Sequence, residues 1–124
     1  MVRRRRRTIA IDFDGVIHRY SRGWQDGSIY DEPVEGAREA LARLHRQFRV
    51  VILTTRVNPD MRDPAPQRAA MRRWLQHHGF REGEHYDAIT HVKVPALVYI
   101  DDRALHFTGW AEALAIFDER LGGV

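Results

Sequence analysis

Two pairs of aspartates each come where a short apolar run of the sequence ends. Asp12 and Asp14 close the first such run, and Asp101 and Asp102 directly follow a later one. Carboxylates held close together raise one another's pKa unless a cation compensates their charge. A few hard oxygen ligands, with space left for water and substrate, suit Mg²⁺. Each pair also has a plainer interpretation, because aspartates commonly make turns or cap helices.

Hydroxyl groups and a single lysine stand between the two acidic pairs. Thr54, Thr55 and Arg56 come at the end of a second apolar run. Arg56 could contact a substrate phosphate or form a structural ion pair, and the sequence favours neither. The chain has 19 arginines, and Lys93 is its one lysine. A lysine ammonium is a compact charge that can bridge a carboxylate and a phosphate, which favours a functional role for Lys93 over a chance surface position.

The elements that must position these residues alternate between strand and helix. Apolar runs predict strands at 8–13, 48–54, 86–90 and 96–100, and amphipathic periodicity predicts helices at 33–47, 66–78 and 110–121. Such an order predicts an α/β fold with a mostly parallel sheet covered by helices on both faces, a three-layer Rossmann-like arrangement. Ligands bind outside the carboxyl ends of the strands in such sheets. The acids, the hydroxyls and the lysine are therefore expected together at one edge.

Four segments in this order resemble the four motifs of the haloacid dehalogenase superfamily. They are Asp12-Phe13-Asp14-Gly15-Val16, Thr54 after the run VVIL, Lys93, and Ile100-Asp101-Asp102. The resemblance extends from Ile9 to about Trp110. The stretch from Tyr99 to Ala104, followed by Gly109-Trp110, is also similar to small bacterial and phage members of the superfamily. The resemblance implies a Rossmann-like core and phosphoryl transfer.

The resemblance also implies a role for each residue of the first motif. Asp12 would be the nucleophile that forms an aspartyl-phosphate, and Asp14 would protonate the leaving oxygen and then activate water. An acid at position 14 favours a phosphatase or phosphotransferase, because the dehalogenases of the family lack one there. Mg²⁺ would be held by the Asp12 carboxylate, the Asp14 backbone carbonyl and Asp102. Asp101 would be a second or water-mediated ligand.

The later motifs supply groups for the phosphate. The Thr54 hydroxyl would hydrogen-bond the phosphoryl group with help from the Thr55 backbone N–H, and Arg56 could reach the same phosphate. Lys93 would neutralise phosphate charge and hold Asp12 in place. The large cap domain of many family members is missing, because segment 17–31 is long enough only for a flap or loop and 56–66 holds no domain. An open site of this kind often goes with bulky or polymeric substrates.

The composition fits one globular domain at 8–124, preceded by a basic arm at 1–7. The chain has 124 residues and no cysteine, which excludes disulfides and thiolate chemistry. Arg3–Arg7 supply five of the 20 basic residues, so the remainder has 15 basic residues against 17 acidic ones. The arm could contact nucleic-acid phosphates or could simply be a solvated tail. Apolar runs are too short to cross a membrane and no secretory signal is evident, which predicts a cytoplasmic protein.

Two functional hypotheses follow from the sequence. The first is a Mg²⁺-dependent phosphomonoester hydrolase, acting on a nucleotide, a nucleic-acid end or a phosphoprotein, with the basic arm and the open site favouring a nucleotide or polynucleotide. The second is a non-catalytic nucleic-acid-binding or interaction module that keeps the fold. A binding module has no need for Asp12, Asp14 and Lys93, which favours the first hypothesis. No clear fifth strand follows Asp102, and Leu105–Phe107 is the segment there that could form a short one.

Overall fold

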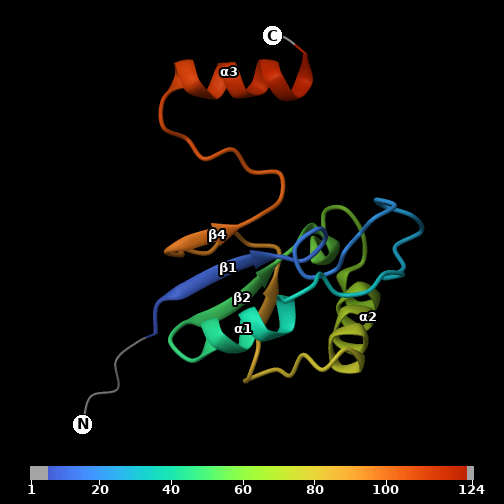
Figure 1. Cartoon of the computed structure of the whole chain (residues 1–124). Coiled ribbons are helices and arrows are strands. Elements are labelled where there is room, and N and C mark those ends of the chain that lie inside the picture. Colours follow the sequence, from blue (N-terminus) through green and yellow to red (C-terminus); the bar gives the residue numbers. More distant parts are fainter. Residues whose placement is uncertain (1–5, 123–124) are drawn as a thin grey trace.

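Four short strands and three α-helices follow one another in the order that the sequence predicts (Figure 1). The structure is a computed structural model, and it describes residues 6–122. Its elements are β1 (Thr8–Asp12), α1 (Ala37–His45), β2 (Arg49–Leu53), the 3₁₀ helix η1 (Thr55–Val57), α2 (Pro64–His77), β3 (Ala88–Thr90), β4 (Val98–Ile100) and α3 (Trp110–Leu121). The η1 turn was not predicted, and Leu105–Phe107, the segment that could have formed a short fifth strand, has no regular structure.

All four strands are parallel, in the order β3-β2-β1-β4. The chain moves outward from β1 through β2 to β3 and then returns to pair β4 with the other side of β1. The strand order therefore reverses at β1, and the carboxyl ends of β1 and β4 flank the place where such sheets bind ligands. The predicted α/β class and parallel sheet are confirmed, and the arrangement is compatible with a Rossmann-like fold.

The main hydrophobic cluster lies on one face of this sheet, and Ala10 and Val51 on the opposite face are also buried. Alternation along the strands points Ile9 and Ile11 of β1 toward the same face as Val50 and Ile52 of β2, and all four are at most 4% exposed. Helices α1 and α2 both contribute to this core, through Ala37 and Leu41 and through Met71, Trp74 and Leu75. Burial of these apolar side chains, at roughly 25 cal/mol per Å², is what holds β1 and β2 beneath the two helices.

Helix α3 lies apart from the sheet, at the end of an extended segment (Figure 1). Trp110 at its start is 72% exposed, and all three residues of β4 are at least 38% exposed. The connection from β3 to β4 contains no helix. It is held to β4 by Tyr99, whose hydroxyl donates a hydrogen bond to the Val94 carbonyl, 2.6 Å away. Helices α1 and α2 pack on one face of the sheet and α3 lies away from it, so the third layer of the predicted arrangement is not seen in residues 6–122.

Helix α1 is shorter than predicted for a local reason. Gly36 has a φ of 83°, in the left-handed region, so a helix cannot run through it from residue 33. Helix α2 begins two residues earlier than predicted because the Asp63 side chain accepts a hydrogen bond from the Ala65 backbone and caps it. These shifts leave the functional edge of the sheet in place.

The segment between β1 and α1 forms an irregular loop and no cap domain. Its two ends are tied together where the Arg19 backbone donates to the Glu32 carbonyl, at 3.0 Å, and the Val34 backbone donates to the Ile17 carbonyl, at 2.8 Å. Arg3–Arg5 of the predicted arm lie outside the described residues. Among residues 6–122, no helix combines the length and the apolar composition that crossing a bilayer requires.

Candidate active site

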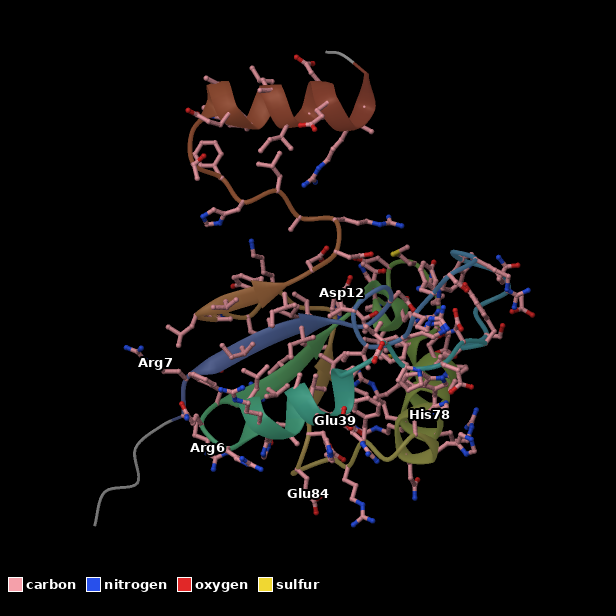
Figure 2. The ribbon with its side chains drawn as sticks, viewed as in Figure 1. Arg6, Arg7, Asp12, Glu39, His78 and Glu84 are labelled. Carbon is pink, nitrogen blue, oxygen red and sulfur yellow. The ribbon has the colours of Figure 1, made fainter. Side chains whose placement is uncertain are left out.

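A cavity of about 430 Å³ opens at the carboxyl ends of β1, β2 and β4. Asp12 stands where β1 ends, whereas Arg6 and Arg7 lie at the opposite end of that strand (Figure 2). The cavity is lined by Asp12, Asp14, Tyr20, Leu53, Thr54, Thr55, His91, Lys93, Asp101, Asp102 and Arg103. Of the predicted site residues, Arg56 alone is absent from this lining. The structure therefore brings the predicted acids, hydroxyls and lysine together at one edge of the sheet.

Three carboxylates converge on one point of the cavity. Asp12, Asp101 and Asp102 each offer an oxygen within 4.8 Å of the others. Burial raises the pKa of Asp12 to about 7, and the charges of Asp101, Asp102 and Asp14 add to this against a 2.8 Å hydrogen bond from the Phe13 backbone. Carboxylate oxygens at this spacing are the donor set that Mg²⁺ takes, and a divalent cation would relieve their repulsion. The residues present therefore fit the metal that the sequence predicts.

Gly15 gives Asp102 the space to reach this cluster. Its φ is 86°, and a Cβ on Gly15 would overlap Oδ2 of Asp102. Asp102 thus sits directly against the backbone of the loop that follows β1. Asp101 is held differently, because its Oδ1 accepts a 2.7 Å hydrogen bond from the Arg103 backbone. The requirement for glycine at position 15 is therefore set by the second acidic pair as well as by the turn.

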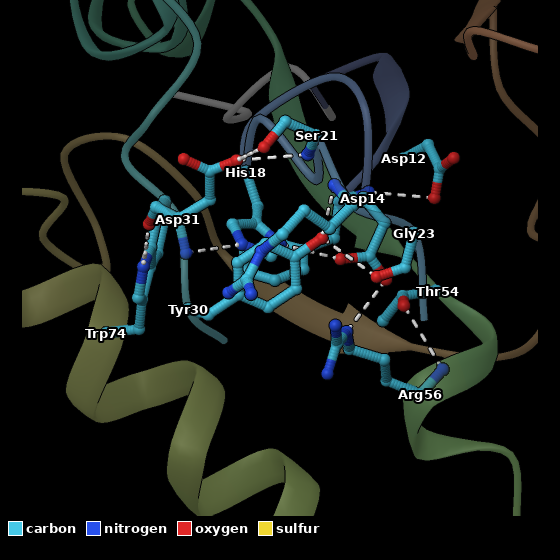
Figure 3. A network of polar contacts seen from close by, with 12 residues as sticks. Asp12, Asp14, His18, Ser21, Gly23, Tyr30, Asp31, Thr54, Arg56 and Trp74 are labelled. Atoms are coloured by element: carbon cyan, nitrogen blue, oxygen red, sulfur yellow. Dashed lines mark hydrogen bonds and ion pairs between the residues drawn. The ribbon is translucent and has the colours of Figure 1, made fainter. Parts of the chain in front are cut away.

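Asp14 lies outside the carboxylate cluster because two nitrogen donors hold it (Figure 3). Its Oδ1 lies 2.9 Å from His18 Nδ1, and its Oδ2 accepts a 2.7 Å bond from Arg56 Nε. Burial favours the neutral form of Asp14, but the hydrogen bonds from His18 and Arg56 outweigh it and lower the pKa of this carboxyl. The two aspartates of the first motif are thus shifted in opposite directions, although they stand only two positions apart in the sequence.

Arg56 does not face the cavity as a phosphate ligand. Its side chain is 2% exposed, and it pairs with Asp14, so the structural ion pair is the interpretation that the structure supports. The other substrate contacts predicted nearby are in the cavity wall. Thr54 is 4% exposed, and its Oγ1 accepts a 3.2 Å bond from the Arg56 backbone, while Thr55 is exposed. Arg56 therefore supports the site from behind.

Lys93 lies in the cavity wall without an ion pair to Asp12. Its Nζ stands 5.0 Å from the centre of the Tyr99 ring, in a cation–π contact. No salt bridge within residues 6–122 joins Lys93 to an acid. The predicted position beside the acids is confirmed, and the predicted contact with Asp12 is not formed. The ammonium group is accordingly available to a ligand in the cavity.

The sequence analysis missed His91 and Arg103 in the cavity wall and the histidine behind Asp14. His91 directly follows β3, and Arg103 follows the acidic pair that comes after β4. Their positions just after strands could have predicted that both residues lie near the cavity. His18 offered a weaker signal, since it stands four residues after Asp14 in a loop. Searches against protein-family models, curated proteins and solved structures found no match to this chain.

Proposed function

We propose that this protein is a Mg²⁺-dependent phosphomonoester hydrolase of the haloacid dehalogenase type, which works through an aspartyl-phosphate. The observation that carries the proposal is the convergence of the Asp12, Asp101 and Asp102 carboxylates within 4.8 Å, in one cavity with Asp14 and Lys93. These three carboxylates would hold the metal. When bound, Mg²⁺ would draw charge from the phosphoryl group and favour the ionised form of Asp12.

The first half-reaction transfers the phosphoryl group to the enzyme. A carboxylate oxygen of Asp12 attacks phosphorus, a new P–O bond forms to Asp12, and the bond from phosphorus to the ester oxygen breaks. The lowered pKa of Asp14 keeps it ionised, so it must first take a proton from solvent; it then gives that proton to the departing oxygen, which leaves as an alcohol. Lys93 and the Thr54 hydroxyl face the cavity, where they can bind the phosphoryl oxygens as charge develops on them.

The second half-reaction returns the enzyme to its starting state. Asp14, now a carboxylate, takes a proton from a water molecule in the cavity, and that water attacks phosphorus. The bond between phosphorus and Asp12 breaks, so that inorganic phosphate leaves and the Asp12 carboxylate is restored. One group therefore serves as acid and then as base, which requires Asp14 to keep a fixed direction through both steps.

Nucleotides and nucleic-acid ends are the phosphomonoesters that we propose as substrates. The Tyr20 ring lines the cavity beside the acids, where it can stack on a base. No cap domain stands over the cavity in the part of the chain that the structure describes. Arg6 and Arg7 lie at the far end of β1, roughly 15 Å along the strand, so they would contact a long nucleic acid and not a mononucleotide.

The test is Mg²⁺-dependent hydrolysis of p-nitrophenyl phosphate, followed by a panel of nucleotides and phosphorylated oligonucleotide ends. Asp12→Asn should abolish turnover and remove the phosphoenzyme that mass spectrometry detects after rapid quenching of the wild type. Asp60→Asn is the matched control, because Asp60 is exposed and outside the cavity. Hydrolysis by Asp12→Asn at the wild-type rate would refute the proposed function. So would the absence of Mg²⁺-dependent hydrolysis of every substrate by the wild type.

A further inference from the structure

Asp14 joins the cavity to a buried cluster that the cavity does not touch. His18 binds one of its carboxylate oxygens and Arg56 binds the other (Figure 3). The His18 side chain is 0% exposed and the Arg56 side chain is 2% exposed, and neither residue lines the cavity. These two residues therefore have no direct access to a substrate. Whatever they contribute to the reaction passes through Asp14.

The second ring nitrogen of His18 fixes which nitrogen carries the proton. The Asp31 backbone N–H lies 3.1 Å from Nε2, and a backbone N–H can only donate. Nε2 must accept, so the proton of the neutral ring is on Nδ1 and is donated to Asp14. The rings of Phe13, Tyr30 and Trp74 surround the imidazole with centroids 5.6, 5.3 and 5.5 Å away. The donor is thus fixed in both direction and tautomer.

Arg56 is fixed equally firmly on the other side of Asp14. Besides Nε, which donates to Asp14, its Nη1 donates to the Gly27 carbonyl at 2.9 Å and to Gln67 Oε1 at 3.0 Å. Gln67 Nε2 donates to the same Gly27 carbonyl at 2.9 Å. Three acceptors on the rigid, planar fork leave the guanidinium one orientation. Its support comes from the 17–31 loop and from α2.

We propose that His18 and Arg56 are positioning residues that aim the Asp14 carboxylate at the leaving oxygen of the substrate. The inference rests on the proposed function. One N–H occupies one lone pair on each Asp14 oxygen, so one lone pair remains on each for the transferred proton. Asp31 and Gly27 of the 17–31 loop anchor the two donors. This segment, predicted as a short flap or loop, is thereby a support beneath the catalytic acid.

The positioning role makes a prediction that depends on the leaving group. An ester with a poor leaving group, such as phenyl phosphate, needs the proton from Asp14, whereas 2,4-dinitrophenyl phosphate does not. His18→Phe keeps a ring of similar size and removes the Nδ1 donor. We expect kcat/KM for phenyl phosphate to fall about 10- to 100-fold, with little change for the dinitrophenyl ester. His18→Asn, which places an amide N–H near Nδ1, should restore part of the loss.

The control for general damage is another histidine–carboxylate pair of the same protein. His45 Nε2 lies 2.8 Å from Asp87 Oδ1, outside the cavity, so His45→Phe removes a comparable contact without touching Asp14. We expect it to leave the ratio of the two kcat/KM values unchanged. Gly27→Ala perturbs the hydrogen bonds of Arg56 from another side. Its Cβ would lie 2.6 Å from Gln67 Nε2 and displace the Gln67 side chain that accepts a hydrogen bond from Arg56. It should reproduce the selective loss.

Two results would overturn the inference while leaving the proposed function intact. The first is an equal loss for both esters in His18→Phe and Gly27→Ala, or no loss for either, in an enzyme whose wild type turns over with Mg²⁺. The second is independent of activity: ring ¹⁵N shifts of the metal-free wild type should show Nδ1 protonated and Nε2 bare. A protonated Nε2 contradicts the hydrogen-bond network itself. A wild type that hydrolyses neither ester refutes the proposed function, and the positioning role with it.

Discussion

Replacing Asp12 by asparagine should stabilise the metal-free protein at pH 8 while it removes activity. The pKa of Asp12 rises from 3.8 to about 7 on folding, chiefly through burial and then through Asp101 and Asp102. The folded state therefore holds this proton more tightly than the unfolded state, so the wild type loses stability as pH rises from about 4 to 7. A shift of this size sets an upper limit of about 4 kcal/mol above pH 7, and solvent screening of the partly exposed Asp12 carboxylate reduces the effect to about 2 kcal/mol. The asparagine side chain keeps an oxygen for the Phe13 N–H and carries no charge.

Thermal unfolding in EDTA at a series of pH values between 4 and 8 measures this effect. At about 4 °C per kcal/mol for a domain of this size, Asp12→Asn should melt roughly 8 °C above the wild type at pH 8. The difference should vanish near pH 4, where both side chains are neutral in the folded protein. Asp60→Asn, at an exposed position, should follow the wild type throughout. Parallel pH profiles for Asp12→Asn and the wild type would refute the assignment of the shift to Asp12.

Mg²⁺ should remove the advantage in melting temperature that Asp12→Asn has over the wild type. A cation at the cluster binds the ionised form of Asp12, so its apparent affinity should rise about tenfold per pH unit up to pH 7 and then level off. Excess Mg²⁺ should accordingly raise the melting temperature of the wild type at pH 8 and leave Asp12→Asn nearly unchanged. An equal Mg²⁺ response in the two proteins would place the cation elsewhere.

Three further changes test other parts of the site. Gly15→Ala should lower the free energy of unfolding by about 1 kcal/mol or more, because the residue has a φ of 86°. Its Cβ would also displace Asp102, so the variant should lose the Mg²⁺-induced rise in melting temperature. A normal Mg²⁺ response would contradict this. Lys93→Met should lower kcat by about 100-fold. Its affinity for Mg²⁺, measured by the same thermal unfolding experiments, should be unchanged. The double change Arg6→Gln and Arg7→Gln should leave kcat/KM for mononucleotides unaltered, and a severalfold drop would show that the arm contributes to the site.

The sheet and its functional edge could be predicted because buried parallel strands leave a strong local signal. The run from Phe48 to Thr54 is mostly apolar because β2 is buried on both faces: Val50 and Ile52 face the helices, and Val51 on the opposite face is 1% exposed. Such a pattern needs no knowledge of the partner. The acids that end β1 and β4 then fall at one edge by topology alone. Their convergence within 4.8 Å follows from strand order and not from any property of the individual residues.

What failed depends on contacts that a local pattern does not specify. The apolar stripe of α3 predicts that the helix has a buried face, but it does not say which surface covers that face, and Trp110 is 72% exposed. The shortened α1 follows from the backbone angle of Gly36, which sequence periodicity ignores. The ion pair of Arg56 with Asp14 joins residues 42 positions apart, so both of its interpretations had equal support until the fold was known.

The opposite shifts of Asp12 and Asp14 explain how one short motif can supply two different functions. The protein provides its own donors to Asp14, through His18 and Arg56, and leaves Asp12 among like charges with a backbone N–H as its one hydrogen-bond partner in the described residues. In the metal-free protein these directions are the reverse of the two proposed starting roles, because a raised pKa favours a neutral Asp12 and a lowered pKa favours an ionised Asp14. A cation from solution is therefore needed at Asp12 and not at Asp14. This asymmetry matches a nucleophile that depends on metal and an acid–base group that depends on the fold, and it makes the His18 and Asp12 variants separable tests of the two.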